Sequence, residues 1–375
     1  MAGIYLHIPF CKQKCSYCDF HFSTSFHAYR EQMIATMKEE IRVRVPYLCD
    51  QVVETIYFGG GTPSILSSEE LEGMLLSVKE NYSVIDTTEI TIEANPDDIT
   101  EENLITWKKI GVNRLSIGLQ SFREEDLRWM NRAHSSIEAL NCVKLAKQAG
   151  FKNISVDLIY GLPDLSIEDW KKNIQTVIDF GIQHVSAYCL TVEEKTVLSK
   201  WVEQRKIIPA NEDEQSEQFE TLVSMLSEAG IEQYEISNFS ISGFHSQHNS
   251  NYWKAKHYLG IGPSAHSFNG VSRSWNIANN RQYMKLFEDK KEWFETEILS
   301  TKDQFNELLL IGLRTSDGVD LSQLKSIQEP SEIFWKKVET MKNDDWLIVS
   351  EKRIKLTKSG KLKADYIASE LFTDD

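Results

Sequence analysis

The sequence lacks a long apolar run, an excess of basic residues and an export signal. No stretch reaches the roughly 18–20 consecutive apolar residues of a membrane-spanning helix, and no basic region followed by an apolar one opens the chain. Lys and Arg number 41 against 56 Asp and Glu, which gives a formal net charge of −15. Because phosphate backbones are bound mainly by clustered Lys and Arg, nucleic acid is not an expected partner. We expect a cytoplasmic protein with an ordinary globular core.

A fourth clustered cysteine is also missing. Cys49, Cys142 and Cys189 stand alone in apolar or helical contexts, and we predict that they are small core residues. The other three cysteines fall within one short stretch, "CKQKCSYC", at Cys11, Cys15 and Cys18, and Phe20 follows where a further thiol could have stood. In a chain with no export signal, such a group favours metal or redox chemistry over disulfide bonds.

The spacing C-x3-C-x2-C suits a cluster with one open position. Three thiolates in one loop can ligate three irons of a [4Fe–4S] cluster and leave the fourth iron free for an outside ligand. Thiolates also bind zinc. A structural zinc site normally needs four protein ligands, so His7 or His21 would have to complete it. Taken by themselves, the thiols are compatible with both metals.

Short apolar runs alternate with amphipathic segments through the first half of the chain, which is typical of parallel βαβ units. Six such units predict an α/β fold, a partial (β/α)6 barrel, with a doubly wound open sheet as the alternative. The expected strands cover 4–8, 55–59, 89–95, 114–120, 153–161 and 184–191, and the expected helices cover 28–44, 68–81, 100–110, 136–149 and 166–180.

Three parts are expected along the chain. Residues 1–210 form the barrel, and residues 211–300 form an α+β extension with a helix at 212–229, a strand in "IEQYEIS" and a loop-rich stretch containing "HNSNYW". Residues 301–375, with short helices before a hairpin in "WLIVSEKRIKLT", suggest a winged-helix-like module. In so acidic a chain we expect this module to serve packing or docking.

Polar or glycine residues follow each predicted strand. Examples are "GGGTP" at 59–63, Glu93 in "EANP", Gln120 in "LQSF" and Asp157 in "VDLIYG". In parallel barrels the carboxyl ends of the strands converge on one mouth, so these residues should face a common cavity. Taken singly, "GGGTP" could be only a turn, and Glu93, Asp157 or Arg132 could be structural or solvated. No Gly-Lys-Ser/Thr follows the glycines, so they do not form a nucleotide P-loop.

The cysteine spacing after a first barrel strand resembles that of the radical S-adenosylmethionine (SAM) proteins. The resemblance implies that SAM chelates the open iron through its amino and carboxylate groups, and that one electron from the cluster cleaves SAM to a 5′-deoxyadenosyl radical. It also implies that Tyr17 lies against the adenine. Gly60, Gly61 and Thr62 would then offer backbone groups to the SAM amino group.

Several longer phrases resemble one branch of these proteins, the oxygen-independent coproporphyrinogen III oxidases and their relatives, the haem chaperones. They are "YLHIPFC", "FGGGTP", "IEANP", "GVNRLSIGLQSF", "NRAH", "VDLIYGLP", "QYEISNF" and "GIGPSAHS". In the oxidases, matching positions contact one or the other of two SAM molecules. The match implies SAM contacts at Tyr5, Gly60, Thr62, Glu93, Gln120, Arg132, Asp157 and Ile261.

Three features favour the haem chaperone side of this resemblance. Phe20 replaces a further oxidase cysteine, the chain starts ten residues before Cys11 where the oxidases have a long arm, and "HNSNYW" begins at His248. A His imidazole is a common axial ligand of haem iron, so the resemblance implies haem binding by His248. Alternatively, His248 only supports a loop while Tyr252 and Trp253 fill the core, and other imidazoles lie nearby at His245, His257 and His266.

The functional expectation is a haem chaperone. It would bind haem and a SAM-coordinated [4Fe–4S] cluster, and it would transfer haem to an acceptor protein, which could be membrane-associated, with an electron donor protein as a further partner. The cluster and SAM could gate this transfer. The alternatives are an oxygen-independent coproporphyrinogen III oxidase, which would form protoporphyrinogen IX by oxidative decarboxylation, and a structural zinc protein.

Overall fold

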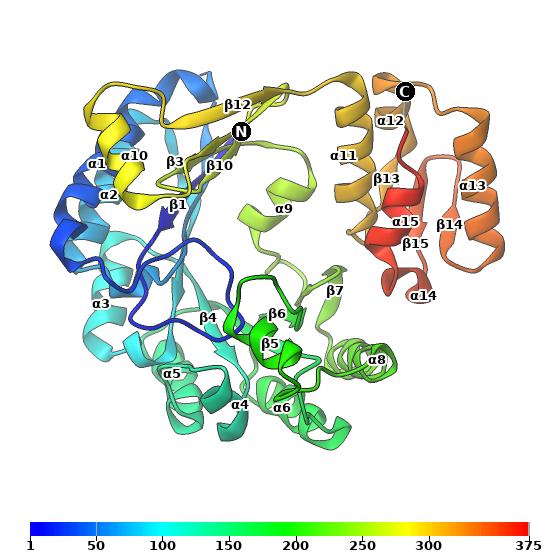
Figure 1. The fold of residues 1–375 in the computed structure, drawn as a ribbon, viewed down its shortest axis with the longest axis horizontal. Helices are drawn as coiled ribbons and strands as arrows, with labels where there is room; N and C mark the ends of the chain where they lie inside the picture. Colours follow the sequence, from blue (N-terminus) through cyan, green and yellow to red (C-terminus); the bar gives the residue numbers. More distant parts are fainter. Residues whose placement is uncertain (50, 374–375) are drawn as a thin grey trace.

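Six parallel strands and their connecting helices form the body of the protein, shown by a computed structural model that describes residues 1–49 and 51–373. The strands hydrogen-bond in sequential order, so the sheet winds in one direction and the doubly wound alternative is wrong. Figure 1 shows the helices packed around the outside of this curved sheet. The strands are β1 (Ala2–Ile8), β2 (Val53–Gly60), β3 (Val84–Ala94), β4 (Arg114–Gln120), β5 (Asn153–Tyr160) and β6 (His184–Cys189).

The helices between these strands begin at side-chain caps and bury one apolar face against the sheet. Ser67 and Glu70 form a capping box at the start of α2, as do Ser135 and Glu138 at α5. The helices are α1 (Arg30–Val43), α2 (Ser68–Asn81), α3 (Glu101–Ile110), α4 (Glu124–Trp129), α5 (Ser136–Gln148) and α6 (Ile167–Asp179). Short 3-10 turns cover His27–Tyr29, Val45–Leu48, Pro63–Ile65 and Pro96–Asp98.

The middle of the chain extends the sheet at both edges. Strands β8 and β7 add antiparallel beside β6, while β9 pairs parallel with β1 and leads to antiparallel β10, β11 and β12. The result is a single sheet of twelve strands. The added elements are α7 (Val197–Glu203), α8 (Glu212–Glu228), β7 (Glu232–Glu235), β8 (Asn238–Ser240), α9 (Gln247–Trp253), β9 (His257–Ile261), β10 (His266–Phe268), β11 (Ser272–Asn276), α10 (Asn280–Glu288) and β12 (Phe294–Ile298).

The C-terminal region builds a separate apolar core from helices and a three-stranded antiparallel sheet in the order β13-β15-β14. It lies beside the barrel at the orange and red end of Figure 1, with α11 facing α9. Its elements are α11 (Thr301–Leu313), β13 (Val319–Asp320), α12 (Leu321–Ile327), α13 (Glu332–Asn343), β14 (Leu347–Val349), β15 (Arg353–Leu356), α14 (Lys358–Lys361) and α15 (Ala364–Glu370).

The structure confirms the parallel α/β barrel with a C-terminal module and corrects several local predictions. "HNSNYW" lies in a helix, α9, rather than in a loop, because Ser246 caps it by accepting from the backbone N–H of Asn249. The segment "IEQYEIS" contains β7 and then turns directly into β8. The three-part division at residues 210 and 300 stays a prediction.

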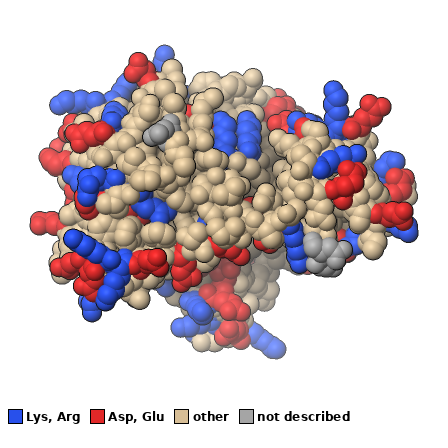
Figure 2. Space-filling model, turned by 90° about the horizontal axis from the view of Figure 1, so that it is seen from above, with Lys and Arg blue, Asp and Glu red and all other residues tan. Residues whose placement is uncertain are grey.

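Two cysteines also differ from their prediction as core residues. Cys49 is exposed because it ends the turn Val45–Leu48 in a left-handed conformation, with φ of 49°. Cys189 lines a cavity at the end of β6, while Cys142 is buried as expected. No helix among the described residues has the length and apolar character needed to cross a membrane. On the face shown in Figure 2, acidic and basic side chains are intermixed toward both ends, and the middle is mostly uncharged apart from a small basic group.

Candidate cofactor site

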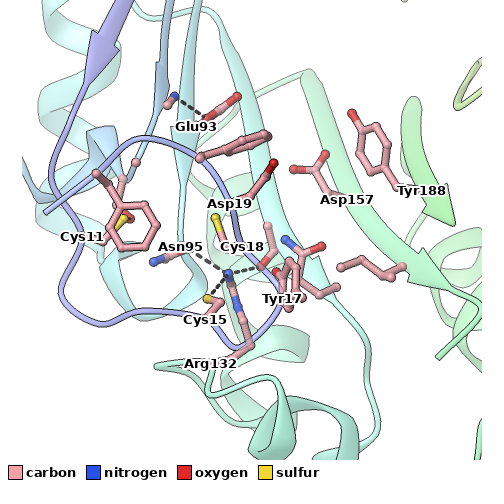
Figure 3. Close-up of a pocket in the computed structure, with 18 of the residues that line it drawn as sticks. Cys11, Cys15, Tyr17, Cys18, Asp19, Glu93, Asn95, Arg132, Asp157 and Tyr188 are labelled. Atoms are coloured by element: carbon pink, nitrogen blue, oxygen red, sulfur yellow. Dashed lines mark hydrogen bonds between the residues drawn. The ribbon is translucent and has the colours of Figure 1, made fainter. Parts of the chain in front are cut away.

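A cavity of about 550 Å³ opens where the carboxyl ends of the barrel strands meet. Eleven predicted site residues line it: Cys11, Cys15, Tyr17, Cys18, Gly60, Gly61, Thr62, Glu93, Gln120, Arg132 and Asp157. Figure 3 shows how the cysteine loop passes across strands that carry Glu93 and Asp157. Segments more than a hundred residues apart therefore share one mouth, as the strand-end pattern predicted.

Two of the predicted SAM contacts lie elsewhere. Tyr5 lines the two neighbouring cavities, where its ring stacks on Tyr57 with centroids 6.1 Å apart. Ile261 is fully buried in the main core, on the strand β9 that pairs with β1. Their roles in SAM binding stay predictions.

The cysteine loop is held by backbone hydrogen bonds at its start and in its middle. The N–H of Cys11 donates to the carbonyl of Ser23 at 3.1 Å. In the middle of the loop, Ser16 donates to the carbonyl of Met130 at 3.0 Å and accepts from the N–H of Leu198 at 2.8 Å. These contacts fix the loop without using the thiol groups, which remain available for a metal cluster.

Burial makes ionisation of the thiols unfavourable. Burial raises the pKa of Cys11 to about 12, although a hydrogen bond from the Thr62 hydroxyl, 3.3 Å from Sγ, works in the opposite direction. Burial likewise raises the pKa of Cys18 to about 11. Both thiols are therefore protonated at neutral pH on their own, and binding iron would release their protons.

Arg132 lies between the cysteine loop and the strands. Its Nη1 donates to Cys15 Sγ at 3.4 Å, and its Nη2 donates to Asn95 Oδ1 at 2.8 Å and to the Gly118 carbonyl at 2.9 Å (Figure 3). Burial alone would lower its pKa, but Tyr17 and Cys15 outweigh burial and raise it. Its Nε is buried without a hydrogen-bond partner among the described residues. A fixed positive charge thus faces one of the predicted iron ligands.

The glycine loop after β2 approaches the cysteine loop closely. The N–H of Gly61 donates to the Ile8 carbonyl at 2.8 Å, and the N–H of Thr62 donates to the Phe10 carbonyl at 2.7 Å. A Cβ added at Gly61 would lie 2.5 Å from the Phe10 carbonyl oxygen, and Gly60 has a φ of +102°. Both positions therefore require glycine, and the loop packs closely against the residues that lead into the cysteine loop.

Two partly buried carboxyl groups complete the wall. Glu93 accepts from the Tyr57 hydroxyl at 2.8 Å and from the Gly60 N–H at 3.2 Å, and burial raises its pKa to about 7. Asp157 accepts from the Ser116 hydroxyl at 3.2 Å, and burial raises its pKa to about 6. Near neutral pH these groups can ionise when a cationic group, such as the SAM amino group, comes close.

The structure adds lining residues that the sequence analysis did not single out. Asp19, Asn95 and Tyr188 line the same cavity, as does Phe20, which the sequence analysis did consider and which is 66% exposed. Asn95 ends the predicted strand 89–95, so the strand-end rule could have found it, whereas Tyr188 lies inside the predicted strand 184–191 and gave no such signal. Asp19 had no such signal, because only the path of the loop turns it inward.

These residues fit an iron–sulfur cluster with SAM. Among the described residues, no three His, Cys, Asp or Glu side chains converge on one ion position. A cubane cluster does not need such convergence, because its irons occupy separate corners. The zinc alternative would need His7 or His21 as a fourth ligand. The Nε2 atoms of both rings already have partners: that of His7 is hydrogen-bonded to the His21 carbonyl at 2.8 Å, and that of His21 to Asn280 Oδ1 at 2.7 Å.

His248 lies behind this site, on helix α9, which packs against β1 and β2. It is 2% exposed, its Nδ1 is 2.8 Å from the Thr55 hydroxyl, and its Nε2 is 2.8 Å from the Tyr252 hydroxyl. Burial lowers its pKa to about 3, so the ring is neutral. In this conformation both ring nitrogens have protein partners, and iron ligation by His248 would require the ring to leave its place. Its assignment to haem stays a prediction.

Comparison with known proteins places this geometry in a family. Residues 5–177 match the Radical SAM superfamily, and residues 299–362 match the HemN C-terminal domain. The chain is 32% identical over 366 residues to the haem chaperone HemW of Bacillus subtilis, covering 96% of this chain and 97% of the relative. The chain belongs to the HemW family of radical SAM proteins. Its cofactors are accordingly SAM and a [4Fe–4S] cluster.

Other HemW relatives span this chain in the same way. The Lactococcus lactis haem chaperone HemW is 32% identical over 378 residues, covering 99% of this chain and 97% of the relative. The Escherichia coli haem chaperone HemW is 36% identical over 265 residues, covering 70% and 69%. Among solved structures, the coproporphyrinogen III oxidase HemN of Escherichia coli superposes with a TM-score of 0.85 at 22% identity, covering 99% of this chain and 90% of that one. At 22% identity, the likeness to HemN shows only that the two chains share a fold.

Proposed function

We propose that this chain is a haem chaperone that binds haem beside a SAM-coordinated [4Fe–4S] cluster and transfers the haem to an acceptor protein. The observation that carries the proposal is the near full-length similarity to curated relatives named haem chaperone HemW. The cofactor cavity supports it, because residues of the family motif lie together there. The proposal names the acceptor only as a general class of partner, a haem-accepting protein. It specifies neither which protein that is nor whether a membrane holds it.

In this proposal each wall of the cavity has its own task. Cys11, Cys15 and Cys18 hold three irons, and the backbone of the Gly60–Thr62 loop together with Glu93 holds the SAM amino group. A [4Fe–4S] cluster with SAM on its open iron supplies one-electron chemistry when bound. Arg132 holds Cys15 in place and lowers the cost of its negative charge.

The other SAM contacts follow from their position on the wall. Tyr17, Gln120 and Asp157 line the cavity beside the cluster loop, where they can orient the adenosyl part of SAM. Gln120 is held by a bulge that breaks the register between β4 and β5, and its φ is 67°. A strained backbone at a strand end is a common way to aim a side chain into a site.

One reconstituted preparation tests the proposal against its main rival. The purified chain, loaded anaerobically with iron and sulfide, is titrated with haem and then incubated with coproporphyrinogen III, SAM and a reductant. We expect a Soret band from bound haem and no protoporphyrinogen IX. Absence of haem binding refutes the proposal, and formation of protoporphyrinogen IX identifies an oxidase instead.

A further inference from the structure

A second cavity of about 400 Å³ lies between strands β1, β9, β10 and β11 of the main sheet and helix α11 of the C-terminal module. Aromatic side chains from α9, β9 and β10 form much of its wall: Tyr252, Trp253, Tyr258 and Phe268. The ring of Tyr252 meets the ring of Tyr258 edge-on, with centroids 4.6 Å apart. Flat, apolar walls of this kind suit a large aromatic ligand.

One imidazole in this cavity is free to act as a ligand. His266 is exposed, it lines the cavity, and no hydrogen bond of the described residues involves its ring. Desolvation and then the nearby Arg273 lower its pKa, so the ring is neutral at physiological pH. His7 also lines the cavity, but its Nε2 is hydrogen-bonded to the His21 carbonyl at 2.8 Å and its Nδ1 lies 3.3 Å from the Tyr5 hydroxyl.

The pleat of the sheet places a cation on the same face. Residues directly opposite each other in antiparallel strands share a face, and Arg273 on β11 stands opposite Phe268 on β10. His266 is two residues before Phe268, so it also points to that face. Arg273 donates through Nη1 to the Tyr258 hydroxyl at 3.0 Å, and its guanidinium lies 5.0 Å from the centre of the Phe268 ring.

Arg273 already holds an anion, which shows what it can bind. Its Nε and Nη2 donate to the two carboxylate oxygens of Glu307 on α11, the second at 2.9 Å. This pair is partly exposed, with 29% of the Arg273 side chain and 25% of the Glu307 side chain accessible to solvent. A carboxylate on a ligand could therefore replace Glu307 at the same guanidinium.

Resting on the proposed function, we propose that this second cavity is the haem site, in which His266 ligates the iron, the aromatic walls pack against the porphyrin, and Arg273 receives a propionate in place of Glu307. His248 then acts indirectly, because its Nε2 meets the Tyr252 hydroxyl that forms part of the wall. The assignment separates the iron ligand from the "HNSNYW" segment, which supplies wall residues and their support.

The second cavity also lies next to the cofactor cavity. Tyr5, His7 and Ser264 line both it and a third cavity, which in turn reaches Gly60 and Glu93 at the SAM loop. A porphyrin bound here would therefore lie beside the predicted SAM position, separated by the side chains of β1.

The test is a haem titration of the full-length chain followed by visible absorption, with iron-free protoporphyrin IX as a second probe. We expect His266→Ala to weaken haem binding about tenfold or more, to shift the Soret band, and to recover when free imidazole is added. The same variant should bind iron-free protoporphyrin as the unchanged protein does, since only iron needs the imidazole. His257→Ala is the matched control, because His257 lies on neighbouring β9 outside this cavity.

A charge variant tests the propionate contact independently. Glu307→Gln removes the anion that competes for Arg273, so haem affinity should rise several-fold, whereas Arg273→Met should lower the affinity for both porphyrins. Unchanged Soret position and haem affinity in His266→Ala, with normal binding by the unchanged protein, would overturn this inference and leave the haem chaperone proposal intact. Failure of the unchanged protein to bind haem would overturn both.

Discussion

At the scale of single residues, two partly buried carboxyl groups line the cofactor cavity, at Glu93 and Asp157. Glu93 and Asp157 have raised pKa values because burial removes them from water, and Arg114, buried between the strands, opposes this effect for both. Such groups are costly in a protein without ligands and become useful when a cation arrives. The same residues therefore reduce the stability of the empty protein and prepare it to bind SAM.

Replacing Glu93 with Gln should stabilise the empty protein at pH 8 and weaken SAM binding. Its pKa rises from 4.5 to about 7 in the fold, so its contribution to stability is full below pH 4.5 and is lost as the pH rises through 7. The shift corresponds to at most about 3 kcal/mol. Urea unfolding at pH 5 and pH 8 measures the effect, with the exposed Glu72→Gln as control. A lower stability of Glu93→Gln at pH 8 contradicts the prediction.

Arg132 should set the potential of the cluster. Its hydrogen bond and positive charge at Cys15 stabilise the reduced cluster, which carries more negative charge than the oxidised one. Such contacts to the ligating sulfurs raise the reduction potential. We expect Arg132→Met to move the midpoint potential of the reconstituted cluster to more negative values and to cost about 2 kcal/mol of stability. Spectroelectrochemical titration measures the shift, and an unchanged potential would argue against this role.

At the scale of elements, loops that follow the strands build the site, and their backbone contacts fix it. The N–H groups of Gly61 and Thr62 donate to the carbonyls of Ile8 and Phe10, just before the cysteine loop, so the SAM loop and the cluster loop form one unit. Helix α9 acts in the same way at the opposite side, since the N–H groups of Gln247 and His248 donate to Glu89 on β3, each at 3.1 Å. The helix that the sequence suggested as a haem-binding loop is thereby tied to the sheet.

Adding one methyl group to the glycine loop should disrupt both sites. In Gly61→Ala, the new Cβ would press on the carbonyl oxygens of Ile8 and Phe10, at 2.7 and 2.5 Å, so we expect a loss of about 2 kcal/mol together with weaker SAM binding. Gly73→Ala is the matched control. Gly73 lies within α2 and its Cβ would meet only the flexible end of Lys38, so alanine should stabilise the helix by about 0.5–1 kcal/mol. Thermal melts of both variants, with SAM titration, decide between these outcomes.

At the scale of the whole molecule, the C-terminal module is attached to the barrel through a few polar contacts. Arg314, at the end of α11, pairs with Asp365 at 2.7 Å within the module and with Glu235 of β7 at 3.5 Å in the barrel sheet. Its carbonyl accepts from the Ile236 N–H at 3.0 Å, and its guanidinium lies 5.4 Å from the centre of the Trp253 ring. One residue therefore joins the module, the sheet edge and α9.

Arg314→Ala should loosen the junction between the module and the barrel. Glu235 is 2% exposed, and without the guanidinium it would be left as a buried carboxylate with only neutral partners. We expect a loss of about 2 kcal/mol, less than for a fully buried pair because Arg314 is partly exposed. Denaturant unfolding of Arg314→Ala, Glu235→Gln and the double variant measures the coupling. Additive losses in the double variant would contradict a direct interaction.

The sequence predicted the barrel well for a physical reason. Strands buried on both faces read as continuous apolar runs, and helices of regular length between them leave little choice of topology. The boundaries of β4 match the prediction, while β3 begins five residues earlier than expected, at Val84. The start of β3 is largely exposed, and the polar residues Asp86 and Thr87 interrupt its apolar pattern, so the prediction did not include it.

The order of the residues determined the chemistry, and the three-dimensional packing determined which side chains can take part. Three thiols in one loop, the glycines after β2 and the carboxylates at strand ends are local patterns, and the convergence of parallel strands on one mouth made them a predictable site. Whether an imidazole has a free nitrogen depends on neighbours far along the chain. His248 meets Thr55, 193 residues away, while His266 faces a cavity closed by α11. No local pattern records that difference, because it arises only when segments far apart in the chain pack together.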